Sequence, residues 1–165
     1  MLSYKDFTKY FGSNLSDEDF QLFLEDTFSD LTDYNILDSD YITSEDTGVE
    51  LGFTNNKAFY DDDDNILFAN GRPIFSHFII YPKSIKLIDT LPFAISFNDT
   101  RPVIITKAGI PTQTKEGFAD FMNKNFMVDN YKVNDIVISF DYDTNNQKLN
   151  FIQVRDNNLV EHLKL

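Results

Sequence analysis

Residues 135–156 have the sequence DIVISFDYDTNNQKLNFIQVRD, and this stretch decides the fold class. It contains two runs rich in β-branched and aromatic residues, 135–142 and 148–156, which favour strands. The polar segment DTNN at 143–146 lies between them and predicts a turn. The stretch therefore predicts an antiparallel hairpin, and residues 126–133 predict a strand that precedes it.

A second group of strands is expected in the first half of the chain. Val49, Leu51 and Phe53 alternate with polar or small residues, which predicts a half-buried strand over 48–53. Residues 75–81 form another apolar run of strand length. Shorter strands are expected at 57–60 and 66–68, and a crossing segment with two prolines at 82–98.

Helices are expected where apolar residues recur at helical spacing. Residues 3–11 and 17–31 each show one apolar face, and Ser16 is placed to cap the second helix. Residues 100–108 predict a third helix, because Pro102 falls in its first turn. The remaining expectations are a cap for the third helix at Asn98 or Asp99, a fourth helix at 115–124 with Phe118, Phe121 and Met122 inward, a loop at 32–47, and a short helix or strand in the tail 157–165.

Helical segments precede strands twice along the chain. This order favours an α+β fold, in which N-terminal helices and later helical segments pack on one face of an antiparallel sheet. The two pairs of strands can also be aligned with each other. We therefore expect one domain over 1–165 that can be divided into helix-then-strand repeats at 1–82 and 92–156.

Length and composition exclude several classes of protein. The chain has 165 residues, enough for one domain with its own core. It has no cysteine, which excludes disulfides, thiolate nucleophiles and cysteine-ligated metal centres. No apolar run follows a basic start and no apolar stretch is long enough to span a membrane, so we expect a cytoplasmic protein.

The charge of −13 is distributed unevenly. Residues 1–70 carry seventeen acidic side chains and three lysines, a net charge of −14, whereas residues 71–165 carry ten acidic and eleven basic ones, a net charge of +1. Nucleic acids and anionic membranes bind clustered Lys and Arg, so neither is an expected partner. A basic protein is favoured; the alternative is that the acids only keep the chain in solution.

Motifs for catalysis or cofactor binding are weak. Asp61–Asp64 invites a metal site, but adjacent side chains point in different directions and a solvated turn is the better interpretation. Residues 141–146 begin like a calcium loop, but Asn146 replaces the required glycine, so a hairpin turn is expected. His77 and His162 form no recognisable triad and suit structural or interface roles. We expect no enzyme activity, no metal and no cofactor.

The segment LPFAISFNDTR, Leu91–Arg101, resembles a segment of the form LPFGLSF-[SDN]-x-[ST]-R found in many proteins of bacterial toxin–immunity loci. The resemblance covers residues 48–156 and departs at Ala94, where glycine is usual, and at Pro102, where a helix former is usual. The layout of two helix-then-strand units is also similar to the tandem-repeat fold of beta-lactamase inhibitor proteins.

The resemblance implies an immunity protein of a polymorphic-toxin or contact-dependent growth inhibition system. Such proteins bind one cognate toxin domain, often a nuclease, whose phosphate-binding cleft is basic and suits an acidic inhibitor. Two alternatives remain open: a non-catalytic acidic adaptor or regulator of another basic protein, and an enzyme that uses carboxylates or a metal.

The toxin-binding surface is expected where the acidic side chains are concentrated. Tyrosines near these acids are added because Tyr provides contact area at low entropic cost. The candidate residues are Asp17, Glu18, Asp19, Glu25, Asp26, Tyr34, Tyr41, Tyr60, Asp61, Asp62, Asp63 and Asp64.

Overall fold

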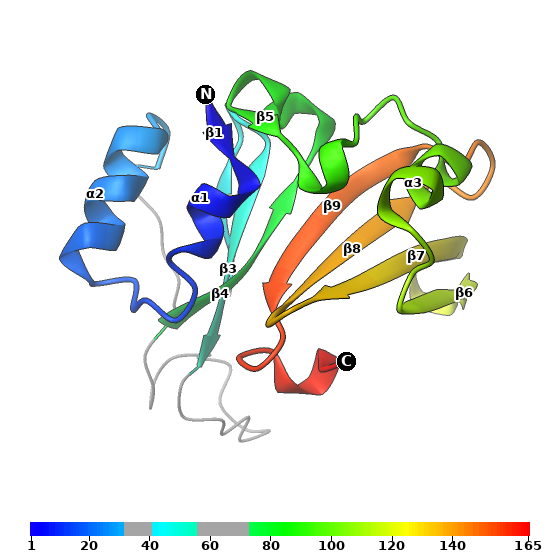
Figure 1. The fold of residues 1–165 in the computed structure, drawn as a ribbon. Helices are drawn as coiled ribbons and strands as arrows, with labels where there is room; N and C mark the ends of the chain where they lie inside the picture. The colour runs from blue at the N-terminus through cyan, green and yellow to red at the C-terminus, as the bar shows by residue number, and fades with distance from the viewer. Residues whose placement is uncertain (32–40, 56–72) are drawn as a thin grey trace.

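A seven-stranded antiparallel sheet dominates the computed structural model, which describes residues 1–31, 41–55 and 73–165 (Figure 1). Its strands, in sheet order, are β2 (Tyr41–Ser44), β3 (Val49–Asn55), β4 (Pro73–Ile80), β9 (Leu149–Asp156), β8 (Ile136–Tyr142), β7 (Lys124–Val133) and β6 (Gln113–Ala119). The α-helices are α1 (Tyr4–Thr8), α2 (Glu18–Thr27) and α3 (Arg101–Ala108). The short elements are the parallel pair β1 (Leu2–Ser3) and β5 (Ile88–Thr90), and the 3-10 turns η1 (Pro82–Lys86), η2 (Pro92–Ala94), η3 (Asp120–Met122) and η4 (Glu161–Leu163).

All three α-helices pack on one face of the sheet. One row across five adjacent strands consists of Leu51, Phe78, Val154, Ile138 and Tyr131, and every member is buried in the common core. In Figure 1, α1 and α2 cover the β3–β4 part of this face, and α3 covers the part near β7. The predicted α+β fold with helices beside an antiparallel sheet is confirmed, and the division into repeats stays a prediction.

Aromatic side chains fix the N-terminal helices to the sheet. The ring of Phe7 in α1 lies 5.0 Å from that of Phe78 in β4, measured between centroids. The ring of Phe20 in α2 stacks on Phe75 of β4 at 5.0 Å. All four rings are fully buried, and burying one such side chain contributes about 1.5–3 kcal/mol. This packing holds the outward face of α2 in a defined place.

The predicted caps of α2 and α3 are wrong. Asp17 occupies the N-cap position of α2, because the backbone N–H and hydroxyl of Ser16 both donate to Asn14 Oδ1 instead. Thr100 occupies the N-cap position of α3, since Asp99 Oδ2 accepts hydrogen bonds from Ser96 N–H and Lys107 Nζ. The helices themselves are confirmed, although α1 and α2 end earlier than expected.

The prediction of a helix over 115–124 is wrong. These residues form most of β6, the turn η3 and the start of β7. β6 pairs with β7 from Gln113 opposite Asn130 to Ala119 opposite Lys124. Phe118, Phe121 and Met122 have the i, i+3, i+4 spacing of a helix, but pairing with the long strand β7 determines the conformation. They point outward rather than inward, with exposed fractions of 54%, 89% and 46%.

Part of the expected loop at 32–47 is also a strand. Residues 41–44 form β2, in which Tyr41 pairs with Gly52 of β3. The strands expected at 48–53, 75–81, 126–133, 135–142 and 148–156 are confirmed, and the tail contains η4. The segments 32–40, 57–60 and 66–68 lie outside the described residues.

Candidate protein-binding site

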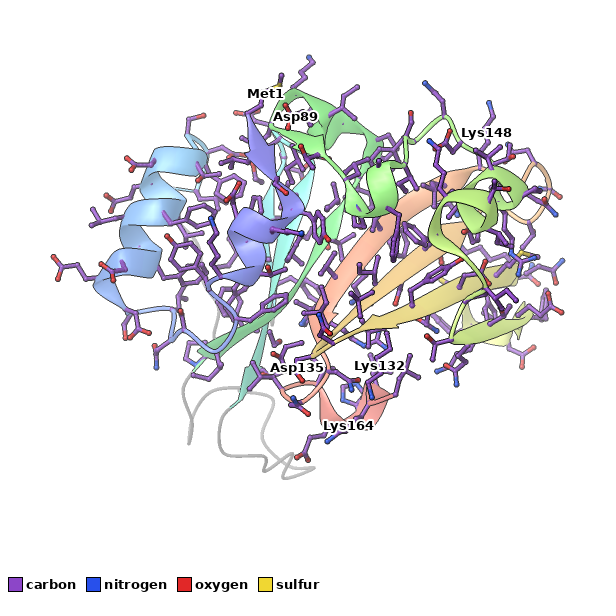
Figure 2. The ribbon with its side chains drawn as sticks, in the orientation of Figure 1. Met1, Asp89, Lys132, Asp135, Lys148 and Lys164 are labelled. Carbon is purple, nitrogen blue, oxygen red and sulfur yellow. The ribbon has the colours of Figure 1, made fainter. Side chains whose placement is uncertain are left out.

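The outward side of α2 presents acidic side chains around one leucine. Phe20 and Leu24 point into the core, so the residues on the opposite side of the helix point away from the sheet. Leu22 is 52% exposed although it is apolar. Figure 2 shows oxygen-tipped side chains projecting from α2 on the side away from the sheet. We call this surface the acidic face of α2; it comprises Asp17, Glu18, Asp19, Leu22, Glu25 and Asp26, all exposed.

In the part of the chain that the structure describes, no salt bridge neutralises the acids on this face. Among the described residues, the salt bridges are Lys9–Asp6, Arg101–Asp129 and Lys107–Asp99, none of which includes an acid of the acidic face of α2. The sequence explains this result, because residues 10–56 contain neither Lys nor Arg. The negative potential of this surface is therefore directed at solvent or at a binding partner.

The helix dipole affects the acids at the two ends of α2 in opposite ways. Glu18 and Asp19 lie in the first turn, where the positive end of the helix dipole stabilises them. Glu25 and Asp26 lie in the last turn, which carries no basic residue, and the negative end of the dipole disfavours them there. Local helix stability therefore does not account for Glu25 and Asp26. Residues that break a local rule without compensation are expected at functional sites.

The other acid near α2 has a structural role that sequence reasoning missed. Asp30 accepts hydrogen bonds from the Ser44 hydroxyl at 2.7 Å and from the Asp46 N–H at 3.0 Å. Partial burial acts to raise the pKa of Asp30, but these hydrogen bonds outweigh it and the pKa is lowered. Asp30 thus ties the segment after α2 to the turn between β2 and β3.

Only part of the predicted site comes together. Asp17, Glu18, Asp19, Glu25 and Asp26 lie on the acidic face of α2. Tyr41 lies elsewhere: its pairing with Gly52 places it on the sheet face opposite the helices, and its hydroxyl is 3.0 Å from His77 Nε2. Tyr41 therefore does not lie on the acidic face of α2, and its contribution to toxin binding stays a prediction. The remaining candidates, Tyr34, Tyr60 and Asp61–Asp64, lie outside the described residues.

His77 has a packed position on that opposite face, as predicted for a histidine on a sheet face. A Cβ atom added to Gly52 would lie 2.1 Å from His77 Nε2, so the ring occupies the space that this glycine leaves open. Ser76 Oγ lies 2.8 Å from His77 Nδ1, but both side chains are buried, so this pair is closed to a substrate. Burial, with Arg155 and His162 nearby, lowers the pKa of His77 to about 4.

The segment Leu91–Arg101 builds the connection between α3 and the sheet. Phe93 and Ala94 have φ values of 55° and 52°, so the glycine that is usual at position 94 would adopt this backbone more easily. Arg101 donates two hydrogen bonds, of 2.7 and 3.0 Å, to the completely buried Asp129 of β7. Thr114 of β6 adds a third at 2.6 Å. Spacing alone did not reveal this pair, because 28 residues separate its members.

Comparisons with family models, curated proteins and solved structures find no match to this chain. The described residues 1–31, 41–55 and 73–165 contain no group of three or more His, Asp or Glu side chains that could hold a metal ion. Within these same ranges, no helix has the length and apolar character needed to cross a membrane.

A second exposed surface lies at the opposite edge of the sheet from β2. Phe118, Phe121 and Met122 belong to β6 and η3, and nothing among the described residues buries them. The charges nearby are Lys115, Glu116, Asp120 and Lys124, which sum to zero. This surface therefore differs from the acidic face of α2 in both charge and apolar content.

Proposed function

We propose that this chain is an immunity protein that binds and neutralises a cognate bacterial toxin through the acidic face of α2. The observation that carries the proposal is the position of Glu25 and Asp26. They are exposed, unpaired with any described cation, and located where the helix dipole disfavours them. A basic partner would reverse that unfavourable energy on binding. The chain acts by binding, in the cytoplasm, and not by catalysis.

The surface has the composition of a recognition site for a basic protein. Leu22 supplies an apolar contact, and the acids around it form a charged rim. Rim acids attract a basic partner over distance and mainly raise its association rate. The resemblance of Leu91–Arg101 to segments of immunity proteins supports the same function, and a nuclease domain is the toxin class whose cleft fits this charge.

The test is binding to the protein encoded directly upstream, where a toxin gene is expected. We expect the two proteins to co-purify and the chain to rescue cells that express the toxin. The double variant Glu25→Gln/Asp26→Asn should associate about tenfold more slowly at low salt, with a smaller difference at high salt.

The matched control is the double variant Asp135→Asn/Glu161→Gln. It removes two exposed acids near the C-terminal turn, where Figure 2 labels Asp135. If both double variants associate more slowly than the wild-type chain, and by the same factor, total charge rather than the acidic face of α2 determines the association rate. If the upstream protein is ignored and another basic protein binds, the chain is an acidic adaptor and the immunity proposal is wrong.

A further inference from the structure

The strand β6 forms one edge of the seven-stranded sheet. Among the described strands, β6 pairs with β7 alone, so its second side has backbone N–H and C=O groups free to pair. Natural proteins usually protect such an edge with charged residues, prolines or bulges. Here the seven residues of β6 contain two charged side chains of opposite sign, Lys115 and Glu116, and no proline, and their pairing with β7 shows no register shift. The edge is therefore available for another strand.

Exposed apolar side chains lie at both ends of this edge. Ile110, three residues before β6, is 90% exposed, and Phe121, two residues after it, is 89% exposed. Antiparallel pairing brings the beginning of one strand to the end of the next. A strand that carries apolar residues at both ends is therefore complementary to itself. From this we propose that two copies of the chain associate by antiparallel pairing of their β6 strands.

Charge favours one of the four registers centred on residues 115–118. A two-fold axis perpendicular to the sheet places one residue opposite its own copy. Centring on Lys115 or on Glu116 would set like charges directly against each other, which destabilises a strand pair. Centring on Phe118 would bring Glu116 opposite Asp120 of the second copy. Centring on Gly117 avoids all three conflicts and places Glu116 opposite Phe118 of the second copy.

The same register brings apolar groups together. The two Phe118 side chains become diagonal neighbours on one face, a separation that aromatic rings bridge. Ile110 of each copy comes near Phe121 and Met122 of the other. Burying these exposed groups supplies a driving force that hydrogen bonds at the edge alone would lack.

The distribution of charge permits this association. The acidic excess belongs to residues 1–70, and the region around β6 is neutral. In Figure 1, α2 and β6 lie at opposite sides of the molecule. Pairing through β6 therefore keeps the acidic faces of α2 in the two copies far apart and leaves them free. The inference does not depend on the proposed function.

Light scattering after gel filtration tests the association over a range of protein concentrations. We expect the mass to rise with concentration from that of one 19.1 kDa chain towards that of two. Phe118→Glu should abolish the rise, because it places carboxylates opposite Glu116 of the second copy. Phe118→Lys should retain more of it, because the charges are then opposite. Ile85→Glu is the matched control: Ile85 is 57% exposed, close to the 54% of Phe118, but lies on η1.

A cysteine scan tests the register, since the chain has no cysteine of its own. Gly117→Cys should form an intermolecular disulfide on oxidation, because opposite Cα atoms in such a pair are about 4.5–5.5 Å apart. Lys115→Cys should not, because its two copies are four residues out of alignment, about 13 Å. The new Cβ at position 117 would lie 3.3 Å from the end of the Phe126 ring, which a small shift of that ring relieves.

Three results would overturn the inference. The first is a mass of one chain at every concentration. The second is an equal loss of association in Phe118→Glu and Ile85→Glu. The third is cross-linking through position 115 rather than 117. If the wild-type chain stays monomeric but Phe118→Glu loses binding to the upstream protein, the β6–β7 hairpin contacts the toxin and does not form a dimer.

Discussion

The acidic face of α2 and the β6 edge are both exposed, but they are built in opposite ways. The acidic face of α2 has five carboxylates around one leucine and is held by buried aromatic rings such as Phe20 on Phe75. The β6 edge is neutral and apolar, and its strand is joined to the buried Arg101–Asp129 pair through Thr114. The acidic face of α2 is thus a charged surface supported by apolar packing. The β6 edge exposes apolar side chains and is supported by a buried ion pair.

This difference indicates two kinds of partner. Uncompensated carboxylates act over several ångströms, are screened by salt, and attract basic proteins. Apolar side chains on an open strand act only at contact and require a complementary strand. The two proposals therefore assign a basic toxin to one end of the molecule and a second copy of the chain to the other. The following predictions test the two halves separately.

The largest expected effect concerns the buried Arg101–Asp129 ion pair that supports β6 and β7. Arg101→Ala should lower the free energy of unfolding by about 3–5 kcal/mol, because it leaves the completely buried Asp129 without its cation. Urea unfolding measures the loss, and hydrogen exchange should show it first in β6 and β7. Lys107→Ala is the control: the Lys107–Asp99 pair is more exposed and should contribute about 0–1 kcal/mol. Equal losses would mean that the buried pair does not support the β6 half.

The sequence predicted elements that depend on local pattern and failed where distant pairing decides. Residues 135–156 contain two runs rich in β-branched and aromatic residues, separated by strong turn residues, so the hairpin was predictable. Phe118, Phe121 and Met122 instead mimic a helix over a short window, and only pairing with β7 shows otherwise. β2 has just four residues, too few for a periodic signal.

The candidate site divides in the same way. The acids of α2 were predictable because a helix that buries Phe20 and Leu24 must expose its opposite side, where the acids lie. The position of Tyr41 on the other face of the sheet could not be predicted, since nothing in the sequence pairs it with Gly52 and His77. The β6 edge was missed entirely, because the order of strands in a sheet is not written in any one segment.

A smaller effect is expected on acidification, in the half that carries α2. His77 has a folded-state pKa of about 4 against an ordinary 6.5, so the unfolded chain binds its proton more readily. Stability should therefore fall as the pH decreases from about 6.5 to 4, by at most about 3 kcal/mol. His77→Gln should flatten this part of the profile in urea unfolding at several pH values. An unchanged slope in His77→Gln would assign the acid sensitivity to carboxylates instead.

The smallest expected effect lies within the acidic face of α2 and has opposite signs at its two ends. Glu25→Gln/Asp26→Asn should stabilise the chain by a few tenths of a kcal/mol, because it removes negative charge from the C-terminal end of the helix dipole. Glu18→Gln/Asp19→Asn should destabilise it by a similar amount, because those acids lie in the first turn. Both variants should nevertheless bind the toxin more slowly, since both remove two exposed carboxylates from the same face. Thermal unfolding at low salt and association rates measured on the same samples separate the two quantities.

A variant at positions 25 and 26 that gains stability and loses association would show that these acids serve binding at the expense of the helix. If stability and association instead changed in the same direction for both pairs, the acids would act through the fold alone, and the contrast with the β6 edge would lose its functional meaning.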